Sequence, residues 1–219
     1  MAKDQILFYV KKMERNFWIE KWKKNEINFH QSQAHPLLVQ HFEKLDLPLG
    51  SRIFLPLCGK TLDVAWLLHK GYRVVGSELV EMAIEQLFEE LKVKPEIREV
   101  GELKLYSTQN LDIFVGDFFH LNSEGLGHVD AVYDRASLVA LPEKMRIAYA
   151  IRLMKMTLNA KQLLIVYDYD QSIMQGPPFS IIDKEVHKHY AETHQLKLVE
   201  SVSVKLKGHE ATEKVWIID

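Results

Sequence analysis

The sequence is poor in cysteine, glycine and proline: its 219 residues include one cysteine, Cys58, 10 glycines and 7 prolines. A lone cysteine excludes an intramolecular disulfide and a thiolate-rich zinc or iron–sulfur site. It is typical of a reducing compartment, so we expect a cytoplasmic protein. Few glycines and prolines, with neither an internal repeat nor a low-complexity tract, indicate no flexible linker. We therefore expect one domain over residues 1–219.

The chain also lacks an excess of one charge and a long apolar run. Lys and Arg number 28 against 30 Asp and Glu, and this net charge of −2 argues against nucleic acid or an anionic membrane as a partner. The near-neutral charge is compatible with a monomer. No stretch approaches the roughly 18 apolar residues of a membrane span, and the N-terminus leads into a charged stretch at residues 11–15. We expect neither export nor membrane insertion.

Apolar residues fall in a repeated alternation of strand and helix. Strands are predicted at 52–55, 72–76, 113–115, 129–133 and 163–167, and helices at 61–70, 81–91 and 145–156. This order predicts a parallel α/β sheet with a ligand crevice at the carboxyl ends of its strands. Alternating residues at 196–206 and an apolar run at 215–218 predict a final antiparallel pair. Residues 1–50 are not required by this sheet and are rich in aromatic side chains, so we expect them to form a lid over a core at 51–219.

The turn after the first strand lacks the glycines of phosphate-binding loops. Gly59-Lys60-Thr61 matches the end of G-x-x-x-x-G-K-[ST], but Phe54 stands where the first glycine belongs. The G-x-G-x-x-G of dinucleotide sites is absent too, since only Gly59 is present. A single glycine lets the backbone approach a ligand closely at one point only, which suits a nucleoside that carries no phosphate.

The ends of the following strands carry side chains suited to a nucleoside. Glu78 lies 21 residues after Leu57, close to the ~20 expected of a carboxylate that accepts from ribose hydroxyls. A solvated acid at a helix start is the alternative. Asp117 and Phe118 offer a polar group for an adenine amine and a ring for its face, although Gly-Asp is also an ordinary turn.

The pair Asp134 and Arg135 follows the strand at 129–133 and places an acid and a guanidinium in the crevice. A cation there would stabilise an anionic ligand group, either a carboxylate or a thiolate. The alternative is a structural ion pair.

These motifs form an ordered set along the chain. Its members are residues 17–22 with 29–31, residues 56–60, 75–78, 116–119 and 134–142, and Gly176-Pro177-Pro178-Phe179. The set resembles the thiopurine S-methyltransferase family, particularly its bacterial members. The stretch after Phe179, including 207–213, carries no family motif, so the resemblance does not indicate which acceptor is used.

The resemblance implies a class I methyltransferase that uses S-adenosyl-L-methionine and releases S-adenosyl-L-homocysteine. It implies a Rossmann-like, seven-stranded, mostly parallel sheet with an antiparallel last strand and helices on both faces. The implied acceptors are aromatic or heterocyclic thiols such as thiopurines. Donor contacts would fall on Trp18, Trp22, Phe29, Leu57, Gly59, Glu78, Asp117, Phe118 and Arg135, and an acceptor loop on Pro177, Pro178 and Phe179.

We expect Arg135, with Asp134 beside it, to stabilise the anionic acceptor or the donor carboxylate. An aromatic thiol ionises near neutral pH, so a dedicated histidine base is unnecessary. His187 and His189 are two residues apart on a predicted helix, which favours surface positions over a metal pair. Cys58 has no evident partner base, which favours a packing role.

No metal is expected, because the acidic strand end at 168–170 is more typical of a turn. The nearest alternative function is methyl transfer to a selenium or tellurium compound, or to oxygen or nitrogen of a small molecule. An NAD-dependent oxidoreductase would use Glu78 in the same way, but the glycine fingerprint is missing. A protein that senses the donor without turnover is the third alternative.

Overall fold

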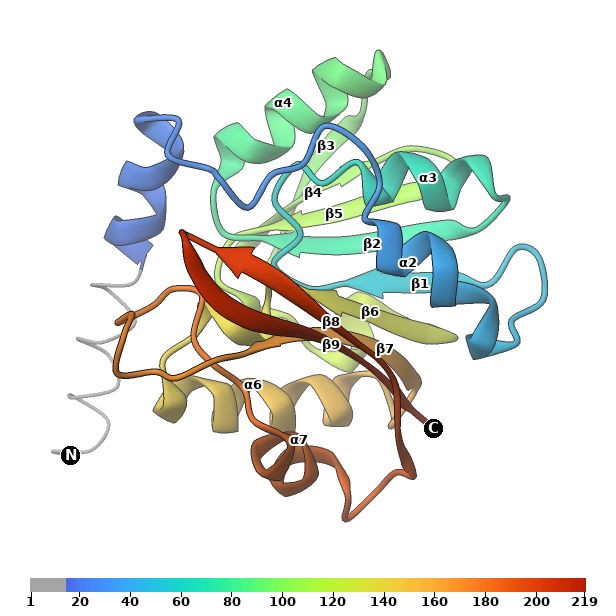
Figure 1. Cartoon of the computed structure of the whole chain (residues 1–219). Coiled ribbons are helices and arrows are strands. Elements are labelled where there is room, and N and C mark those ends of the chain that lie inside the picture. The colour runs from blue at the N-terminus through green and yellow to red at the C-terminus, as the bar shows by residue number, and fades with distance from the viewer. Residues whose placement is uncertain (1–14) are drawn as a thin grey trace, which may run out of the picture.

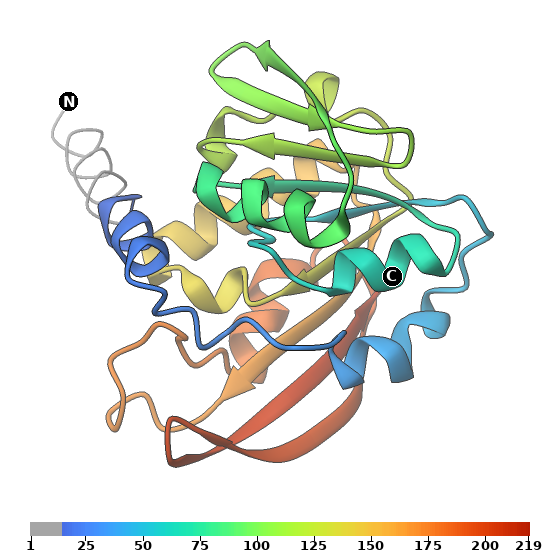
Figure 2. The ribbon, with the colours of Figure 1, turned by 90° about the horizontal axis from the view of Figure 1, so that it is seen from above.

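The computed structural model describes residues 15–219, so most of the charged stretch 11–15 lies outside the described part. In this part nine strands form one sheet in the order β3-β4-β5-β2-β1-β6-β7-β9-β8 (Figures 1 and 2). The strands are β1 Arg52–Leu55, β2 Arg73–Glu78, β3 Glu96–Val100, β4 Leu103–Ser107, β5 Leu111–Val115, β6 Ala131–Arg135, β7 Lys161–Asp168, β8 Leu196–Leu206 and β9 His209–Ile218.

The centre of the sheet is parallel, as the alternation of elements predicts. Strands β5, β2, β1, β6 and β7 pair in parallel, while β9 runs antiparallel to both β7 and β8. The run 163–167 lies inside β7, between β6 and β9. Its unbroken apolar sequence fits a strand that is covered on both faces. The carboxyl ends of the parallel strands therefore meet at one edge of the sheet.

The sheet has nine strands rather than the predicted seven. The additional two, β3 and β4, form an antiparallel hairpin that pairs with β5. Strand β3 has the sequence EIREV at the sheet edge, and its residues are exposed or nearly so. An edge strand with charged side chains lacks the apolar alternation that identifies a strand in a sequence.

Helices cover both faces of the sheet. One face carries α2 Pro36–His41, the 3-10 helix η1 Phe42–Leu45, α3 Asp63–His69 and α4 Glu81–Leu91. The other carries α5 Ser123–Leu126, α6 Glu143–Met156, α7 Asp183–Tyr190 and the 3-10 helices η2 Phe118–His120 and η3 Leu138–Ala140 (Figure 1). Each face has its own apolar core, and the two cores share the sheet as their common wall.

The segment before β1 divides into two parts with different roles in the fold. Leu37, Leu38, Phe42 and Leu45, in α2 and η1, are buried in the core of one sheet face. This half is thus a core layer and not the predicted lid, because its apolar side chains recur at helical spacing toward the sheet. Only the helical residues 15–23 and the strap 24–35 run across the carboxyl edge of the sheet (Figure 2).

Gly76 lets β2 and the turn after β1 approach each other closely. A Cβ at Gly76 would lie 2.6 Å from Cδ1 of Ile113 and 3.0 Å from Sγ of Cys58. We expect Gly76→Ala to lower the free energy of unfolding by about 1–3 kcal/mol through overpacking. Ile113→Val removes the clashing methyl group, so the double variant should recover part of this loss in denaturant unfolding. Strictly additive effects of the two substitutions would contradict this explanation.

Candidate functional site

A cavity of about 1250 Å³ opens at the carboxyl ends of β1, β2, β5, β6 and β7. The strap 24–35 and the preceding helical residues 15–23 form one of its walls. The predicted site residues that line it are Trp18, Trp22, Phe29, Leu57, Gly59, Glu78, Asp117, Phe118, Arg135, Pro177 and Pro178. The structure does not bring Asp134 or Phe179 to the cavity.

The turn after β1 brings its backbone against an indole ring. Leu57 and Gly59 both have positive φ, of 47° and 54°. A Cβ at Gly59 would lie 3.2 Å from Cζ2 of Trp22, so glycine serves both the backbone conformation and the contact. The backbone N–H of Gly59 donates to the Glu78 side chain and is not free to bind a phosphate.

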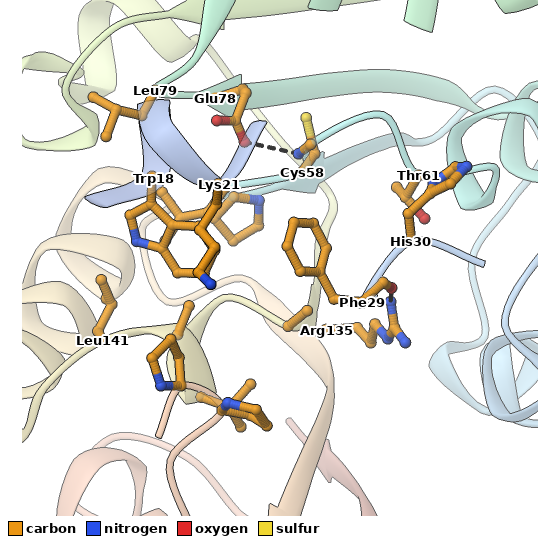
Figure 3. A pocket seen from close by; sticks show the side chains of 18 of the residues that line it. Trp18, Lys21, Phe29, His30, Cys58, Thr61, Glu78, Leu79, Arg135 and Leu141 are labelled. Atoms are coloured by element: carbon orange, nitrogen blue, oxygen red, sulfur yellow. Dashed lines mark hydrogen bonds between the residues drawn. The ribbon is translucent and has the colours of Figure 1, made fainter. Parts of the chain in front are cut away.

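Glu78 is buried at the end of β2 and accepts two backbone hydrogen bonds. Its Oε2 accepts from Gly59 N at 2.8 Å, and its Oε1 accepts from Val80 N at 2.8 Å. Figure 3 shows the Glu78 side chain turned toward the turn after β1. Burial raises the pKa of the Glu78 carboxyl above its usual range, and the bonds from Val80 and Gly59 oppose this. With 6% of Glu78 exposed, a solvated acid is excluded. The lone-pair positions that the backbone bonds leave can accept from a ligand hydroxyl.

Three aromatic side chains of the N-terminal segment cover the turn. The Phe29 ring packs edge to face on Trp18 at 5.8 Å and on Trp22 at 5.9 Å between centroids. Trp18 and Phe29 lie side by side in the pocket drawn in Figure 3. These ring contacts hold the three aromatic side chains in place against the turn, so that they can cover a ligand that binds there.

Asp117 and Phe118 follow β5, but each also has a structural contact. Asp117 Oδ1 accepts from Phe119 N at 2.9 Å and starts η2. The Phe118 ring lies 4.9 Å from that of Tyr149, between centroids, within the core of one sheet face. Both side chains border the cavity, and the remaining lone pairs of Asp117 can accept from an amine there.

Arg135 joins the strap to the sheet. Its Nη1 donates to the carbonyl of Phe29 at 2.9 Å, while the side chain borders the cavity (Figure 3). Farther along the strap, His35 N donates to Asp63 Oδ1 at 2.7 Å, and Tyr133 donates to the other oxygen of Asp63 at 3.0 Å. The strap is therefore fastened at two points to the edge that carries the cavity.

Asp134 lies on the opposite side of β6 from Arg135, because neighbouring residues of a strand point to opposite faces. It is fully buried, and its carboxylate accepts from Tyr149 Oη at 2.6 Å and from Leu138 N at 3.2 Å. Asp134 therefore fixes the loop after β6 and does not line the cavity, contrary to its expected place in the crevice. The strand period alone could have revealed this.

The loop that carries Pro177 and Pro178 is held from several directions. Phe179 N donates to Val139 O at 2.6 Å, and its ring packs under the guanidinium of Arg146 at 5.6 Å. These contacts keep the Phe179 ring outside the cavity. Lys207, on the β8–β9 turn, donates to the carbonyl of Pro177 at 2.8 Å, a contact that no sequence motif indicates.

The cavity also has polar lining residues that the sequence reasoning missed. Asp63, Tyr133 and Tyr167 lie near the carboxyl ends of their strands or at the start of a helix. His30 lines the cavity as well, and burial together with the Lys60 charge lowers the pKa of its imidazole. For Asp63, Tyr133 and Tyr167 the position beside a strand end or helix start was the available signal, whereas His30 lies within the family motif at 29–31 but was not singled out.

The remaining cysteine and histidine expectations have different outcomes. Burial and the Glu78 charge raise the pKa of the Cys58 thiol well above its usual range, which favours the predicted packing role. His187 is exposed, as expected. His189 is buried and lies 3.2 Å from Oε1 of Glu185, so its expected surface position was wrong.

The described residues contain neither a cluster of metal ligands nor a membrane-spanning helix. Among residues 15–219, no three His, Cys, Asp or Glu side chains lie close enough together to hold a metal ion. Asp168 accepts from Lys214 at 2.6 Å, and Asp170 accepts from Ser172 N at 2.9 Å. None of the described helices has the length and apolar character needed to span a bilayer.

Comparison with known proteins decides the family. The family model of thiopurine S-methyltransferase (TPMT) matches residues 13–218. The chain belongs to the thiopurine S-methyltransferase family. A thiopurine S-methyltransferase of Teredinibacter turnerae is 49% identical over 207 residues, covering 93% of this chain and 96% of that one. One of Gluconobacter oxydans is 45% identical over 203 residues, covering 91% and 92%. The predicted family and the methyltransferase class are thereby confirmed.

Solved structures confirm the predicted Rossmann-like fold. A Burkholderia thailandensis 1,6-didemethyltoxoflavin-N1-methyltransferase with bound S-adenosylhomocysteine aligns with a TM-score of 0.63 at 16% identity, covering 93% of this chain and 86% of that one. The magnesium protoporphyrin IX methyltransferase of Synechocystis PCC 6803, also with bound SAH, aligns with a TM-score of 0.58 at 13% identity, covering 95% and 100%.

Asp134 should give this protein a distinctive dependence of stability on pH. Burial raises the pKa of Asp134 from 3.8 to about 6, opposed by its hydrogen bonds. The folded state binds this proton more tightly, so the stability from Asp134 is full below pH 3.8 and is lost as the pH rises through 6. Between pH 4 and 7, unfolding by denaturant should show the wild type losing about 3 kcal/mol relative to Asp134→Asn. A difference that does not vary with pH would contradict the buried ionisation.

Proposed function

We propose that the protein transfers the methyl group of S-adenosyl-L-methionine to the sulfur of aromatic and heterocyclic thiols, with thiopurines as the representative class. The donor supplies an electrophilic methyl group on a positively charged sulfur. The family to which the chain belongs supports this activity, as do neighbours of the same fold whose structures hold S-adenosylhomocysteine. The nicotinamide alternative is set aside, because the family is one of methyltransferases.

The buried carboxylate of Glu78 is the observation that carries this proposal. It lies between two strand ends and bonds the turn at Gly59, so its free lone pairs face a ligand that approaches that turn. A carboxylate suits ribose hydroxyls and would repel a phosphate, which fits a nucleoside that has none. The single glycine of the turn leaves no anion nest, in agreement with the same ligand.

The other lining residues fit the remaining parts of the donor. Asp117 would accept from the adenine amine beside Phe118, and Arg135 would bind the donor carboxylate or the anionic acceptor. Indole faces of Trp18 and Trp22 near a sulfonium would contribute roughly 0.5–2 kcal/mol each. Residues 15–35 would then act as the lid, since they cross the cavity and exclude water from the displacement.

The acceptor would enter between Arg135 and the loop at Pro177 and Pro178, both of which border the cavity. An ionised aromatic thiol needs no base there, because its thiolate attacks directly. A guanidinium beside the sulfur would favour the thiolate over the thiol and so raise the reactive fraction. The protein would contribute the alignment of the two reactants, the exclusion of water and a positive charge beside the thiolate.

We also propose that the enzyme works in the cytoplasm as a monomer and without a metal ion. The single cysteine and the small net charge support the first two statements. No cluster of metal ligands lies among the described residues, and equal turnover with and without a chelator would test the third.

Glu78→Ala should weaken donor binding and also destabilise the fold. The variant loses a ribose acceptor, which should raise the Kd for S-adenosyl-L-methionine at least tenfold in calorimetry. It also leaves Gly59 N and Val80 N without their acceptor, at a cost of about 1–3 kcal/mol in unfolding. Ser77→Ala is the matched control, because Ser77 accepts from Leu57 N in the same turn but does not line the cavity. Wild-type donor affinity in Glu78→Ala would reject the ribose assignment.

The acceptor class is tested by incubating the protein with labelled S-adenosyl-L-methionine and a mixed set of aromatic thiols, selenols, phenols and amines. Mass analysis should find S-methylated products of aromatic and heterocyclic thiols in excess over all others. Selenium products in excess would favour the nearest alternative. Donor binding without any product would favour a sensor.

A further inference from the structure

Two polar side chains on β7 and β9 face each other at the acceptor end of the cavity. Tyr167 and Glu213 are directly paired in the antiparallel register of these strands, so their side chains lie on the same face of the sheet. Tyr167 borders the cavity, whereas Glu213 lies behind it with 7% of its surface exposed. The tyrosine therefore stands between the cavity and a buried carboxylate.

The Glu213 carboxylate has an open position for a proton. Nε2 of His35 lies 3.2 Å from Oε1, but without the alignment of a hydrogen bond, and Oε1 is buried with no hydrogen-bond partner in the described structure. His35 Nδ1 accepts from Leu37 N at 3.3 Å, so the proton of a neutral ring sits on Nε2. Oε1 therefore has one N–H nearby that is not aligned with it and accepts no hydrogen bond, so the carboxylate keeps the capacity to take up a proton.

Tyr167 is suited to pass a proton and not to hold a charge. Burial raises its pKa to about 12, with Glu213 adding to the rise and Arg135 opposing it, so the phenol stays protonated at neutral pH. Its hydroxyl interacts with both Glu213 and Arg135, the charged groups that face it from β9 and β6. Tyr133, on the same sheet face, instead donates to Asp63.

Heterocyclic acceptors differ from aromatic thiols in where their proton lies. A thiopurine-type ring places the proton on a ring nitrogen and carries its sulfur as a thione. Methylation at sulfur therefore requires the ring N–H proton to leave. An ionised aromatic thiol has no such proton, so it needs neither a base nor a relay.

We propose that Tyr167 and Glu213 form a proton relay that removes the ring N–H proton of heterocyclic thione acceptors, a role that rests on the S-methyltransferase function proposed above. The ring proton passes to Tyr167 Oη as the phenol proton passes to the Glu213 carboxylate. The N–H electron pair becomes the new C=N bond, the C=S π bond opens, and its electron pair on sulfur forms the bond to the methyl carbon. The bond from that carbon to the donor sulfur breaks, and its electron pair stays on that sulfur. The released proton rests on Glu213.

The relay predicts an acceptor-specific loss in Tyr167→Phe and Glu213→Gln. At pH 7, kcat/KM for a heterocyclic thione such as 2-mercaptopyrimidine should fall at least tenfold more than kcat/KM for an ionised aromatic thiol such as 4-nitrothiophenol. The thione rate of both variants should then rise with pH, because ionisation of the acceptor in solution replaces the relay. Calorimetry with S-adenosyl-L-methionine, and thermal unfolding, should show that donor affinity and fold are retained.

Tyr133→Phe is the matched control. It removes a hydroxyl from the same sheet face that also donates to a buried carboxylate, and it should change both acceptors by the same factor. An equal loss on both acceptors in Tyr167→Phe would overturn the relay. So would a wild type that methylates the aromatic thiol but not the thione. A wild type that methylates neither overturns the proposed function as well. If Glu213→Gln fails to fold, Tyr167→Phe alone decides.

Discussion

The rest of the site depends on the buried Glu78 carboxylate, which joins two turns that belong to different strands. It satisfies the N–H of Gly59 after β1 and the N–H of Val80 before α4. Because both bonds form within the protein, the turn has its shape before any ligand arrives, and Trp22 packs on the glycine that this shape requires. Burial of the carboxylate charge costs free energy, and the hydrogen bonds from the two N–H groups reduce this cost.

The strap connects the two halves of the cavity. The Phe29 ring of the strap packs on Trp22, which covers the turn at Gly59, while the Phe29 carbonyl and the His35 backbone are bound by Arg135 and Asp63. The acidic side chains of Glu78 and Asp117 border the cavity after β2 and β5, while the guanidinium of Arg135 borders it at the end of β6. Under the proposed function, this distribution of charge suits a reaction in which a cation transfers its methyl group to an anion.

Much of the fold could be predicted from the sequence. Buried parallel strands have unbroken apolar runs, and helices have apolar residues that recur with a period of 3.6 residues. The position of Glu78 beside the first turn was also predictable, from its spacing after that turn. The hairpin of β3 and β4 was not, since an exposed edge strand has no apolar signature. Nor was the pairing of Tyr167 with Glu213, which are far apart in the chain and meet only through the register of two strands.

The bond from Lys207 to the Pro177 carbonyl ties the β8–β9 hairpin to the loop after β7. The two segments come from different stretches of the chain, and one supplies the donor atom while the other supplies the acceptor atom. Because the acceptor atom is a backbone carbonyl, the contact depends on the course of the loop and not on its side chains. A change in the length of either segment would therefore move one partner of this contact, so the position of the loop depends on the β8–β9 turn as well as on β7.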